Sequence, residues 1–264
     1  MRCVTLLSDF GLQDASVASM KGILMQHIPD IPLMDISHEV EPYHLHQAAY
    51  VLNAACWNFP DGSIHLALFD IYREVPSRII LCRMNGHYFI APDNGLLPLA
   101  FGKEPEMIWL CLEVTKDTSF SEIIHYTGTL ISQLKDINQR DPSLPVTEIK
   151  HAPVNLQPVV TDNEVECHVI HIDRFENVVT NLSRNIFDSV GQGRSFRIAF
   201  ARGTQVNELS SHYNDVRDGE RLCRFNSNGF LEISVNRGQA ASLFGLQLFQ
   251  EHHLIYNKIK IIFG

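Results

Sequence analysis

The sequence predicts an α/β domain with a mostly parallel sheet, followed by an all-β, barrel-like domain. Over the first half of the chain, strand-like apolar runs alternate with segments of helical periodicity. After a proline-rich stretch, only short alternating runs remain, separated by Gly, Asn, Asp and Ser turns. We therefore expect an α/β domain at 1–140, a linker at 141–162 and a β domain at 163–264. A chain of 264 residues that is 45% apolar is long enough for both cores.

The α/β domain opens with the run RCVTLLSDF, which is apolar throughout and ends at Asp9. Such a run is typical of a strand buried on both faces. A helix is predicted next from apolar residues at helical spacing between Val17 and His27, with Asp14 or Ser16 as its N-cap. The later strands are expected at 31–37, 63–70, 78–84, 87–93 and 106–114, with helices at 45–59 and 121–137. Asn85-Gly86 predicts a hairpin between two of these strands.

The linker is predicted from its prolines, Pro142, Pro145, Pro153 and Pro158, the last four in the chain. The β domain follows from short alternating runs, which we expect to form strands at 165–173, 194–201, 229–235 and 254–264.

Composition excludes several classes of function. The formal net charge is −9 and no basic tract is present, so we expect neither nucleic-acid nor membrane-surface partners. No run reaches 18 apolar residues and the N-terminus lacks the pattern of a signal peptide, which predicts a soluble, cytoplasmic protein. The six cysteines are widely spaced in apolar runs, as expected of reduced core thiols.

Asp9 and Asp14 stand at the end of the first strand, where open α/β sheets place their ligands. The two residues are equally typical of a turn and a helix N-cap. In a binding site, the first carboxylate can accept hydrogen bonds from two vicinal ribose hydroxyls, and the second can pair with an ammonium group.

Three histidines, His38, His44 and His46, lie close together in ISHEVEPYHLHQ. A metal site is one interpretation of this cluster. The spacing fits no standard ligand motif, so we expect exposed or capping histidines and no metal.

The β domain carries two polar segments. IHIDRFENVVTNL places Asp173, Phe175 and Asn177 in a strand–turn context, where a phenylalanine beside amides suits a flat heterocycle such as adenine. The segment around Ser227 and Asn228 is a second candidate. Both segments are equally compatible with ordinary turns.

Five segments in order resemble one family, the S-adenosyl-L-methionine (SAM) hydroxide adenosyltransferases, or SAM hydrolases, which are related to the fluorinating and chlorinating adenosyltransferases. The segments are TLLSDFGLQDASVASMKG, MDISHEVEP, GHYFIAPDNGLL, IDRFENVVTNL and NSNGFLEISVNRGQAA. The resemblance runs from Thr5 to about Leu246. It implies an N-terminal α/β domain, a C-terminal barrel-like domain, and a homotrimer with SAM bound between the N-terminal domain of one subunit and the C-terminal domain of the next.

The resemblance also implies roles for residues of the first domain. Asp9 matches the acceptor of the ribose hydroxyls, and Asp14 and Ser16 lie toward the methionine end of SAM. Tyr43 stands where some relatives place an aromatic ring near the substrate. The implied reaction is attack of hydroxide on the 5′ carbon of SAM, which releases methionine and leaves adenosine. SAM is the substrate, and no separate cofactor is implied.

In the second domain, Asp173 matches the residue that binds the methionine ammonium group. Phe175 and Asn177 match positions that contact the adenosyl group, and Tyr213 falls where an aromatic ring covers the adenine. Ser227 and Asn228 match the loop that holds the methionine carboxylate. Ala240 matches the position where backbone groups meet the adenine edge.

The nucleophile site departs from the family pattern. Relatives surround the attacking water with an Asp that opens a DPGVGxxRR loop, an Arg from that loop, and a His from an FHGRD segment. Here the loop is FDIYREVPSRII, which keeps Asp70 but has Ser77 at the Arg position. The FHGRD segment is replaced by FSEII, with Ser121 at the His position.

Two hypotheses follow from these departures. In the first, the protein cleaves SAM through a remodelled site in which Asp70 is helped by Arg78 or Arg73, and by His125. In the second, it binds SAM or adenosine without turnover, as a sensor or carrier. Halide as the nucleophile is a third reading, with little in the sequence to favour it.

Overall fold

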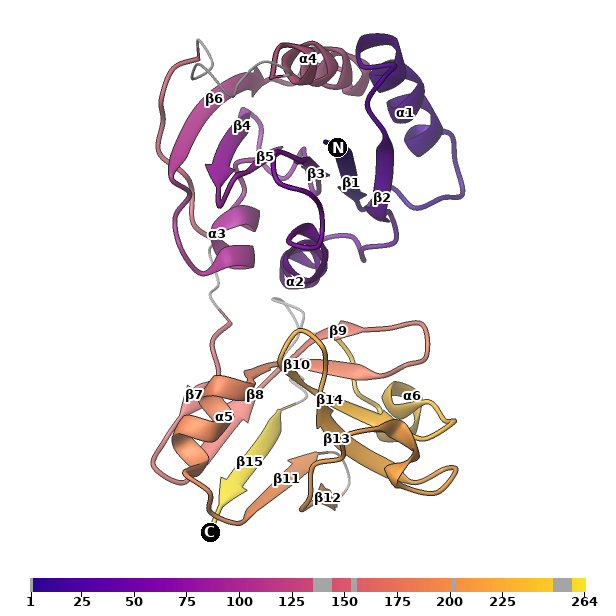
Figure 1. Cartoon of the computed structure of the whole chain (residues 1–264), viewed down its shortest axis with the longest axis vertical. Coiled ribbons are helices and arrows are strands. Elements are labelled where there is room, and N and C mark those ends of the chain that lie inside the picture. The colour runs from indigo at the N-terminus through magenta and orange to yellow at the C-terminus, as the bar shows by residue number, and fades with distance from the viewer. Residues whose placement is uncertain (1, 135–143, 153–155, 201–202, 249–257) are drawn as a thin grey trace. The chain divides into compact units, whose positions relative to one another are not determined.

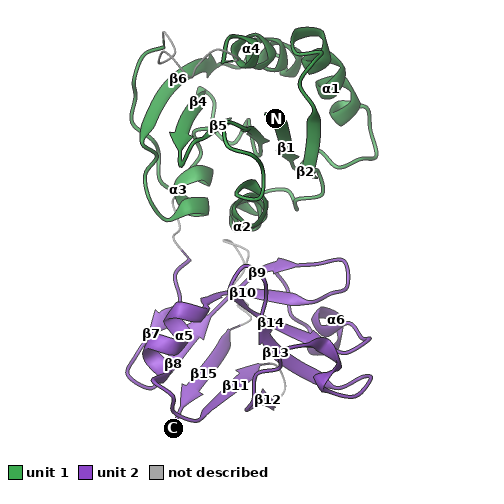
Figure 2. Ribbon diagram, in the orientation of Figure 1, with its two compact units in different colours: residues 1–153 green, residues 154–264 purple. Residues whose placement is uncertain are grey.

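The structure is a computed structural model that describes residues 2–134, 144–152, 156–200, 203–248 and 258–264 (Figure 1). The chain divides into two compact units, residues 1–153 and 154–264 (Figure 2). Four expected segments lie outside the described residues in part: the end of the helix at 135–137, the linker at 141–143 and 153–155, the end of a strand at 201 and the start of the last strand at 254–257.

The first unit is built on a six-stranded sheet with the order β2-β1-β3-β5-β4-β6. Its strands are β1 (Val4–Ser8), β2 (Leu33–Ser37), β3 (Ile64–Leu68), β4 (Ser77–Met84), β5 (His87–Pro92) and β6 (Met107–Val114). β2, β1, β3 and β5 are mutually parallel, whereas β4 runs antiparallel to both β5 and β6. The sheet is therefore mixed. The antiparallel part follows from the hairpin at Asn85-Gly86, where both residues have a positive φ.

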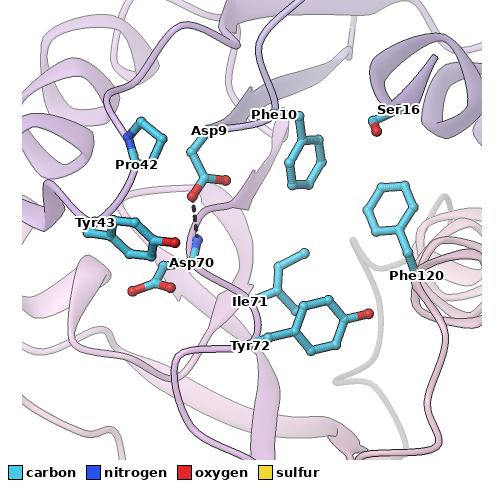
Figure 3. A pocket seen from close by; sticks show the side chains of 9 residues that line it. All are labelled: Asp9, Phe10, Ser16, Pro42, Tyr43, Asp70, Ile71, Tyr72 and Phe120. Carbon is cyan, nitrogen blue, oxygen red and sulfur yellow. Dashed lines mark hydrogen bonds between the residues drawn. The ribbon is translucent and has the colours of Figure 1, made fainter. Parts of the chain in front are cut away.

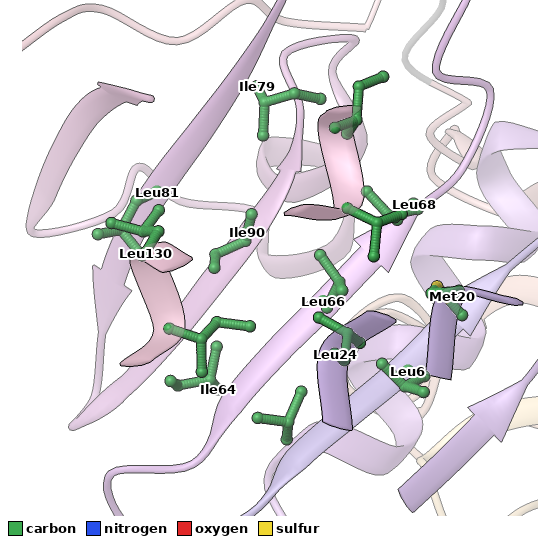
Figure 4. Close-up of a cluster of buried hydrophobic side chains, with 14 of the residues drawn as sticks. Leu6, Met20, Leu24, Ile64, Leu66, Leu68, Ile79, Leu81, Ile90 and Leu130 are labelled. Carbon is green, nitrogen blue, oxygen red and sulfur yellow. The ribbon is translucent and has the colours of Figure 1, made fainter. Parts of the chain in front are cut away.

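Helices cover both faces of this sheet (Figure 1). They are α1 (Ser16–His27), α2 (Leu45–Cys56), α3 (Leu96–Phe101) and α4 (Phe120–Gln133). Successive residues of β1 point to opposite faces: Leu6 packs with α1 and α4, and Leu7 packs with α2 and α3. Figure 4 shows the first of these cores, in which Met20 and Leu24 of α1 meet the strand side chains. Burial on both faces explains why the strands are continuous apolar runs.

The packing of α1 against α4 depends on one glycine. A Cβ atom added at Gly128 of α4 would lie 2.7 Å from the His27 ring at the end of α1. At its other end, α4 begins with a capping box in which Ser119 accepts from the Glu122 backbone N–H and Glu122 accepts from that of Ser119. The start of α4, which borders the pocket described below, is therefore well defined.

Part of the proline-rich stretch belongs to the first unit. Pro145 accepts a hydrogen bond from the backbone of Leu110 in β6, and Thr147 donates one to Ile108. Ile149 and Ala152 pack against the core beside α2 and α3.

The second unit contains two antiparallel sheets, ordered β13-β14-β10-β9 and β12-β11-β15-β8-β7. Its strands are β7 (Val159–Val160), β8 (Glu164–Cys167), β9 (Val169–Ile172), β10 (Val178–Ser183), β11 (Phe196–Phe200), β12 (Thr204–Val206), β13 (Arg221–Phe225), β14 (Phe230–Val235) and β15 (Ile259–Phe263). Two helices, α5 (Arg184–Gly191) and α6 (Ala240–Phe244), accompany the sheets.

The expectation of an all-β barrel is corrected in two respects. The described strands form two separate sheets that do not close into a barrel, and the run expected as one strand at 165–173 breaks at His168 and passes from one sheet to the other. The helix α5 begins directly after β10, with the Ser183 hydroxyl accepting from the Ile186 backbone N–H. Because no residue separates the two elements, no turn marks the boundary between them.

None of the helices in the described ranges combines the length and apolarity needed to cross a lipid bilayer. The six cysteines are free thiols, and all but Cys111 are buried.

A buried histidine pair links β1, β3 and β5. Thr5 Oγ1 lies 2.7 Å from Nδ1 of His65, and Nε2 of His65 lies 3.0 Å from Nδ1 of His87. The His65 ring also stacks on Phe89, with ring centroids 4.8 Å apart. Burial, reinforced by His87, lowers the pKa of His65 to about 3. The ring is therefore neutral in the folded protein near neutral pH.

We expect the first unit to lose stability as the pH falls from about 7 to about 5. The pKa of His65 is lower in the folded than in the unfolded chain, so the unfolded chain binds the proton first and stability is lost below about pH 6.5. The expected loss is roughly 2 kcal/mol. Urea unfolding followed by tryptophan fluorescence measures it, since Trp57 and Trp109, the only tryptophans, both belong to this unit. The variant Thr5→Val/His65→Leu should lose less stability over this pH range; an equal loss would contradict the assignment.

Candidate active site

Two carboxylates meet where neighbouring parallel strands end. Ser8 of β1 lies opposite Leu68 of β3, so the residues that follow, Asp9 and Asp70, emerge at the same edge of the sheet. They line a pocket of about 460 Å³ (Figure 3). The lining residues are Asp9, Phe10, Ser16, Pro42, Tyr43, Asp70, Ile71, Tyr72 and Phe120.

The two carboxylates are coupled through the backbone. Asp70 has a φ of 49°, in the left-handed region, and its backbone N–H donates to Oδ2 of Asp9 over 3.2 Å. Burial raises the pKa of both carboxyl groups above the usual value. The hydrogen bond from Asp70 opposes this rise at Asp9, and the charge of Arg73 opposes it at Asp70. Raised pKa values at a pocket edge are typical of residues that take part in catalysis.

Arg73 is the cation nearest to Asp70. Its guanidinium Nη1 lies 3.8 Å from Oδ2 of Asp70, and its backbone N–H donates to the Asp70 carbonyl. The loop is closed further by Ser77, whose hydroxyl donates to the carbonyl of Ile71 over 3.2 Å. Ser77, at the family's Arg position, therefore supports the loop. The positive charge beside Asp70 comes from Arg73, four residues before Ser77.

Arg78, one of the expected helpers, is engaged elsewhere. Its guanidinium pairs with the fully buried carboxylate of Asp93, and it also donates to Thr147 Oγ1 and to the carbonyl of Glu148. These contacts tie the proline-rich stretch to β4. The structure does not bring Arg78 to the pocket.

His125, the other expected helper, does not line the pocket and contacts the end of α1 that lies away from it. Its Nδ1 is 3.1 Å from Nε2 of His27, the last residue of α1, whereas Ser16 at the start of α1 lines the pocket. The two ends of this helix are roughly 16 Å apart at 1.5 Å per residue. Ser121 is exposed in the first turn of α4.

Of the remaining positions in the first unit, Ser16 and Tyr43 line the pocket. Tyr43 is 82% exposed and has a φ of 68°. Asp14 is exposed, and its Oδ1 accepts from the Ser16 backbone N–H over 2.8 Å. The formal N-cap of α1 is Ala15 and not Asp14 or Ser16, although Asp14 still satisfies one free N–H group of the first turn.

The three histidines of ISHEVEPYHLHQ do not act together. His38 follows β2, and His44 precedes α2 as its N-cap residue. Among the described residues, no group of three or more His, Cys, Asp or Glu side chains is arranged to hold a metal ion.

In the second unit, Asp173 organises the turn between β9 and β10. Its Oδ1 accepts from the backbone N–H groups of Phe175 and Asn177, and its Oδ2 accepts from the Asn177 amide. Phe175 is 74% exposed. The same turn holds the start of α6, because the Glu176 carbonyl accepts from the backbone N–H of Ala241, next to the buried Ala240. This segment is a hydrogen-bonded turn that exposes the aromatic ring of Phe175.

Tyr213 lies near this turn and is held by charged groups. Its hydroxyl donates to Oε1 of Glu232 over 2.9 Å, and the Arg224 guanidinium lies over its ring at 4.8 Å. Burial, followed by Glu232, raises the pKa of Tyr213 to about 12, with a smaller contribution from the charge of Asp173. The phenol is therefore neutral and its ring is fixed in place.

Ser227 and Asn228 lie apart from that group. They occupy the turn between β13 and β14, where Asn226 accepts from the backbone N–H of Asn228. β14 pairs with β10 so that Phe230 faces Ser183 and Ile233 faces Val178. The 226–229 turn and the 173–177 turn consequently lie at opposite ends of these strands.

Five pocket residues carried too weak a signal for prediction: Phe10, Pro42, Ile71, Tyr72 and Phe120. Phe10 and Phe120 meet edge to face at 5.1 Å, and the Tyr72 hydroxyl donates to the Thr118 carbonyl over 3.4 Å. They form an apolar wall of the pocket. In the sequence they are single aromatic or aliphatic residues beside strand and helix ends, which core packing explains equally well.

The structure defines a two-domain protein with a carboxylate-lined pocket at the edge of a mixed α/β sheet, where α/β proteins commonly bind ligands, followed by a unit of antiparallel sheets. Family models identify the class. Residues 4–130 match the SAM hydroxide adenosyltransferase N-terminal domain, and residues 167–252 match the C-terminal domain. The chain belongs to the SAM hydroxide adenosyltransferase family, which confirms the resemblance seen in the sequence.

Individual relatives cover nearly the whole chain. The (R)-S-adenosyl-L-methionine hydrolase of Methanocaldococcus jannaschii is 28% identical over 96% of this chain and 95% of its own. A fluorinase of Nocardia brasiliensis is 25% identical over 92% of this chain and 93% of its own. The crystal structure of an uncharacterized conserved protein from Thermotoga maritima has a TM-score of 0.75 and 26% identity, covering 98% of this chain and 99% of its own.

Proposed function

We propose that the protein cleaves SAM with water to give adenosine and methionine. The observation that carries the proposal is the pairing of Asp9 and Asp70 in one pocket at the ends of β1 and β3. Membership of the SAM hydroxide adenosyltransferase family and the overall match to (R)-SAM hydrolases support it.

In this proposal Asp9 accepts hydrogen bonds from the two ribose hydroxyls and so places the 5′ carbon beside Asp70. Asp70 binds the attacking water and takes its proton. The water oxygen forms a bond to the 5′ carbon as the bond from that carbon to sulfur breaks, and the electron pair of the broken bond remains on the sulfur of methionine. Because the raised pKa of Asp70 makes it a better proton acceptor, it suits the role of general base.

The source of the new oxygen tests this reaction class. In water enriched in heavy oxygen, the isotope should appear in the 5′ hydroxyl of adenosine and not in methionine, as measured by mass spectrometry of the separated products. Label in methionine, or adenosine without label, would contradict attack by water at the 5′ carbon.

Arg73 supplies the positive charge in this site. It lies 3.8 Å from the Asp70 carboxylate, at the position best placed to keep Asp70 ionised and to stabilise developing hydroxide. We expect Arg73→Met to lower kcat about 100-fold. Arg73→Lys, which keeps the charge, should recover part of the rate. Steady-state kinetics with SAM measure both variants, and a wild-type rate in Arg73→Met would contradict the assignment.

The proposal extends to the assembly. We propose a homotrimer in which the binding residues of the second unit, including Asp173 and Tyr213, complete sites whose carboxylates come from the first unit. Its support is that each unit carries only part of the set of positions that the family resemblance assigns to SAM. Light scattering of the purified protein tests the subunit number.

The net charge of −9 supports the absence of nucleic-acid and anionic-membrane partners.

A further inference from the structure

His38 is a buried histidine directly behind the Asp9 loop. It follows β2 and is only 3% exposed. A β-bulge in β2 places it there: Leu6 pairs with Asp35, but the next residue of β1, Leu7, pairs with Ser37. The extra residue in β2 shifts the strand by one position, and the His38 side chain meets Ser8.

Both ring nitrogens of His38 have partners. Nδ1 lies 2.7 Å from the Ser8 hydroxyl, and Nε2 lies 3.1 Å from Oδ1 of Asp35. The other carboxylate oxygen of Asp35 accepts from Lys21 over 2.6 Å. Although partial burial opposes it, the hydrogen bonds from Lys21 and His38 lower the pKa of Asp35, so this carboxylate is ionised near neutral pH.

The directions of these hydrogen bonds follow from the chemistry. An ionised carboxylate only accepts, so Nε2 of His38 carries a proton and donates to Asp35. In the neutral ring Nδ1 is then an acceptor, and the Ser8 hydroxyl must donate to it. The Ser8 oxygen remains free to accept from the backbone N–H of Phe10, which lies 3.4 Å away.

Hydrogen bonds of this network hold the chain before and after Asp9. Ser8 precedes Asp9 and holds the N–H of Phe10, while the carbonyl of His38 accepts from the backbone N–H of Gly11 over 2.7 Å. Gly11 has a φ of 68°, which permits the turn. The position of the Asp9 carboxylate is thereby tied to His38 through one side-chain and one backbone contact.

We propose that His38 is a positioning residue that holds the Asp9 loop in its ligand-binding conformation, and that loss of its bond to Ser8 weakens adenosine binding. The inference rests on the proposed function, in which Asp9 binds the ribose. The charged groups that face His38 are Asp35 on its own strand and, behind it, Lys21 of α1. From β1 it faces the neutral Ser8, with the Asp9 carboxylate one residue further on.

The bond to Ser8 matters because Ser8 is fully buried. Without its acceptor on His38, the Ser8 hydroxyl becomes an unsatisfied buried donor, which is destabilising. The loop that follows Ser8 is the part able to rearrange, which displaces Asp9.

A matched pair of variants separates the two contacts of His38. In His38→Asn the amide oxygen takes the place of Nδ1 and keeps the bond from Ser8. In His38→Gln the longer amide reaches toward Asp35 instead and the bond to Ser8 is lost. Adenosine affinity measured by calorimetry at about pH 8 is the readout. Urea unfolding of each variant at pH 8 reports on folding.

We expect His38→Gln to bind adenosine about tenfold more weakly than wild type at pH 8. His38→Asn should stay within about threefold of wild type. Equal affinities for wild type and His38→Gln, or equally weak binding by His38→Asn and His38→Gln, would overturn the inference. Failure of wild type itself to bind adenosine would instead contradict the proposed function, and with it the role of Asp9.

Discussion

Replacement of Asp70 by asparagine is expected to lower the rate of SAM cleavage about 1000-fold. The asparagine amide has the size of the carboxyl group but cannot accept a proton from water. Asparagine also tolerates the left-handed backbone conformation that Asp70 adopts, with its φ of 49°, better than alanine does. The backbone N–H that donates to Asp9 is retained, so the loss reports on the carboxylate alone.

Single-turnover kinetics and SAM affinity, measured on the same protein, distinguish the two steps. The Asp70→Asn variant should bind SAM within a few-fold of wild type, because the ribose contact is made by Asp9. A variant that loses affinity and rate together would assign Asp70 to binding. A variant that keeps the wild-type rate would contradict its role as the base.

Replacement of Asp9 by alanine is expected to weaken adenosine binding at least about 100-fold. Two hydrogen bonds to the ribose hydroxyls are lost together, and the backbone N–H of Asp70 loses its acceptor. Asp14→Ala is the matched control: Asp14 is exposed, its carboxylate contacts the start of α1, and its proposed partner belongs to methionine, which adenosine lacks. The control should therefore bind adenosine almost as wild type does.

The ligand can be changed as well as the protein. Wild type should bind 2′-deoxyadenosine more weakly than adenosine, whereas Asp9→Ala should bind the two with similar affinity. Such a cycle isolates the contact between the carboxylate and the hydroxyl. If the ratio of the two affinities is the same in both proteins, Asp9 does not contact the ribose.

The sequence shows that Asp9 and Asp70 each end an apolar run, which predicts that both lie at strand ends. It does not show that the two strands are neighbours, because β2 lies between them in the chain and the order β2-β1-β3 follows from the crossover of the sheet. The alternation of strands and helices also overestimated the parallel character of the sheet. The Asn85-Gly86 turn reverses the chain, and β6 then adds to β4 in the antiparallel sense, which no local pattern specifies.

The helper residues were less predictable, because a cation near Asp70 in the sequence has several possible partners. Arg78 is drawn to the buried Asp93, a partner 15 residues away that local spacing does not reveal. His125 lies one helical turn from Ser121, yet it faces His27 on α1 because α4 packs along that helix. Arg73 reaches Asp70 because the loop between them turns back on itself.

The second unit shows the same limit. The prediction of a turn at 173–177 is confirmed, whereas the role of this segment in binding stays a prediction. The placement of Ser227 and Asn228 at the other end of β14 depends on the strand register, and hairpin signals alone do not determine which turns share an end of a sheet.

The roles assigned to Asp9 and Asp70 depend on turnover of SAM at their pocket. Turnover is measured by incubating purified protein with SAM and separating adenosine and methionine by chromatography, with Asp70→Asn as the control. Equal amounts of adenosine and methionine formed by wild type and nearly absent with the variant are the predicted result. Tight binding of SAM or adenosine without any product would contradict it, and would identify the protein as a carrier or sensor built on an enzyme fold.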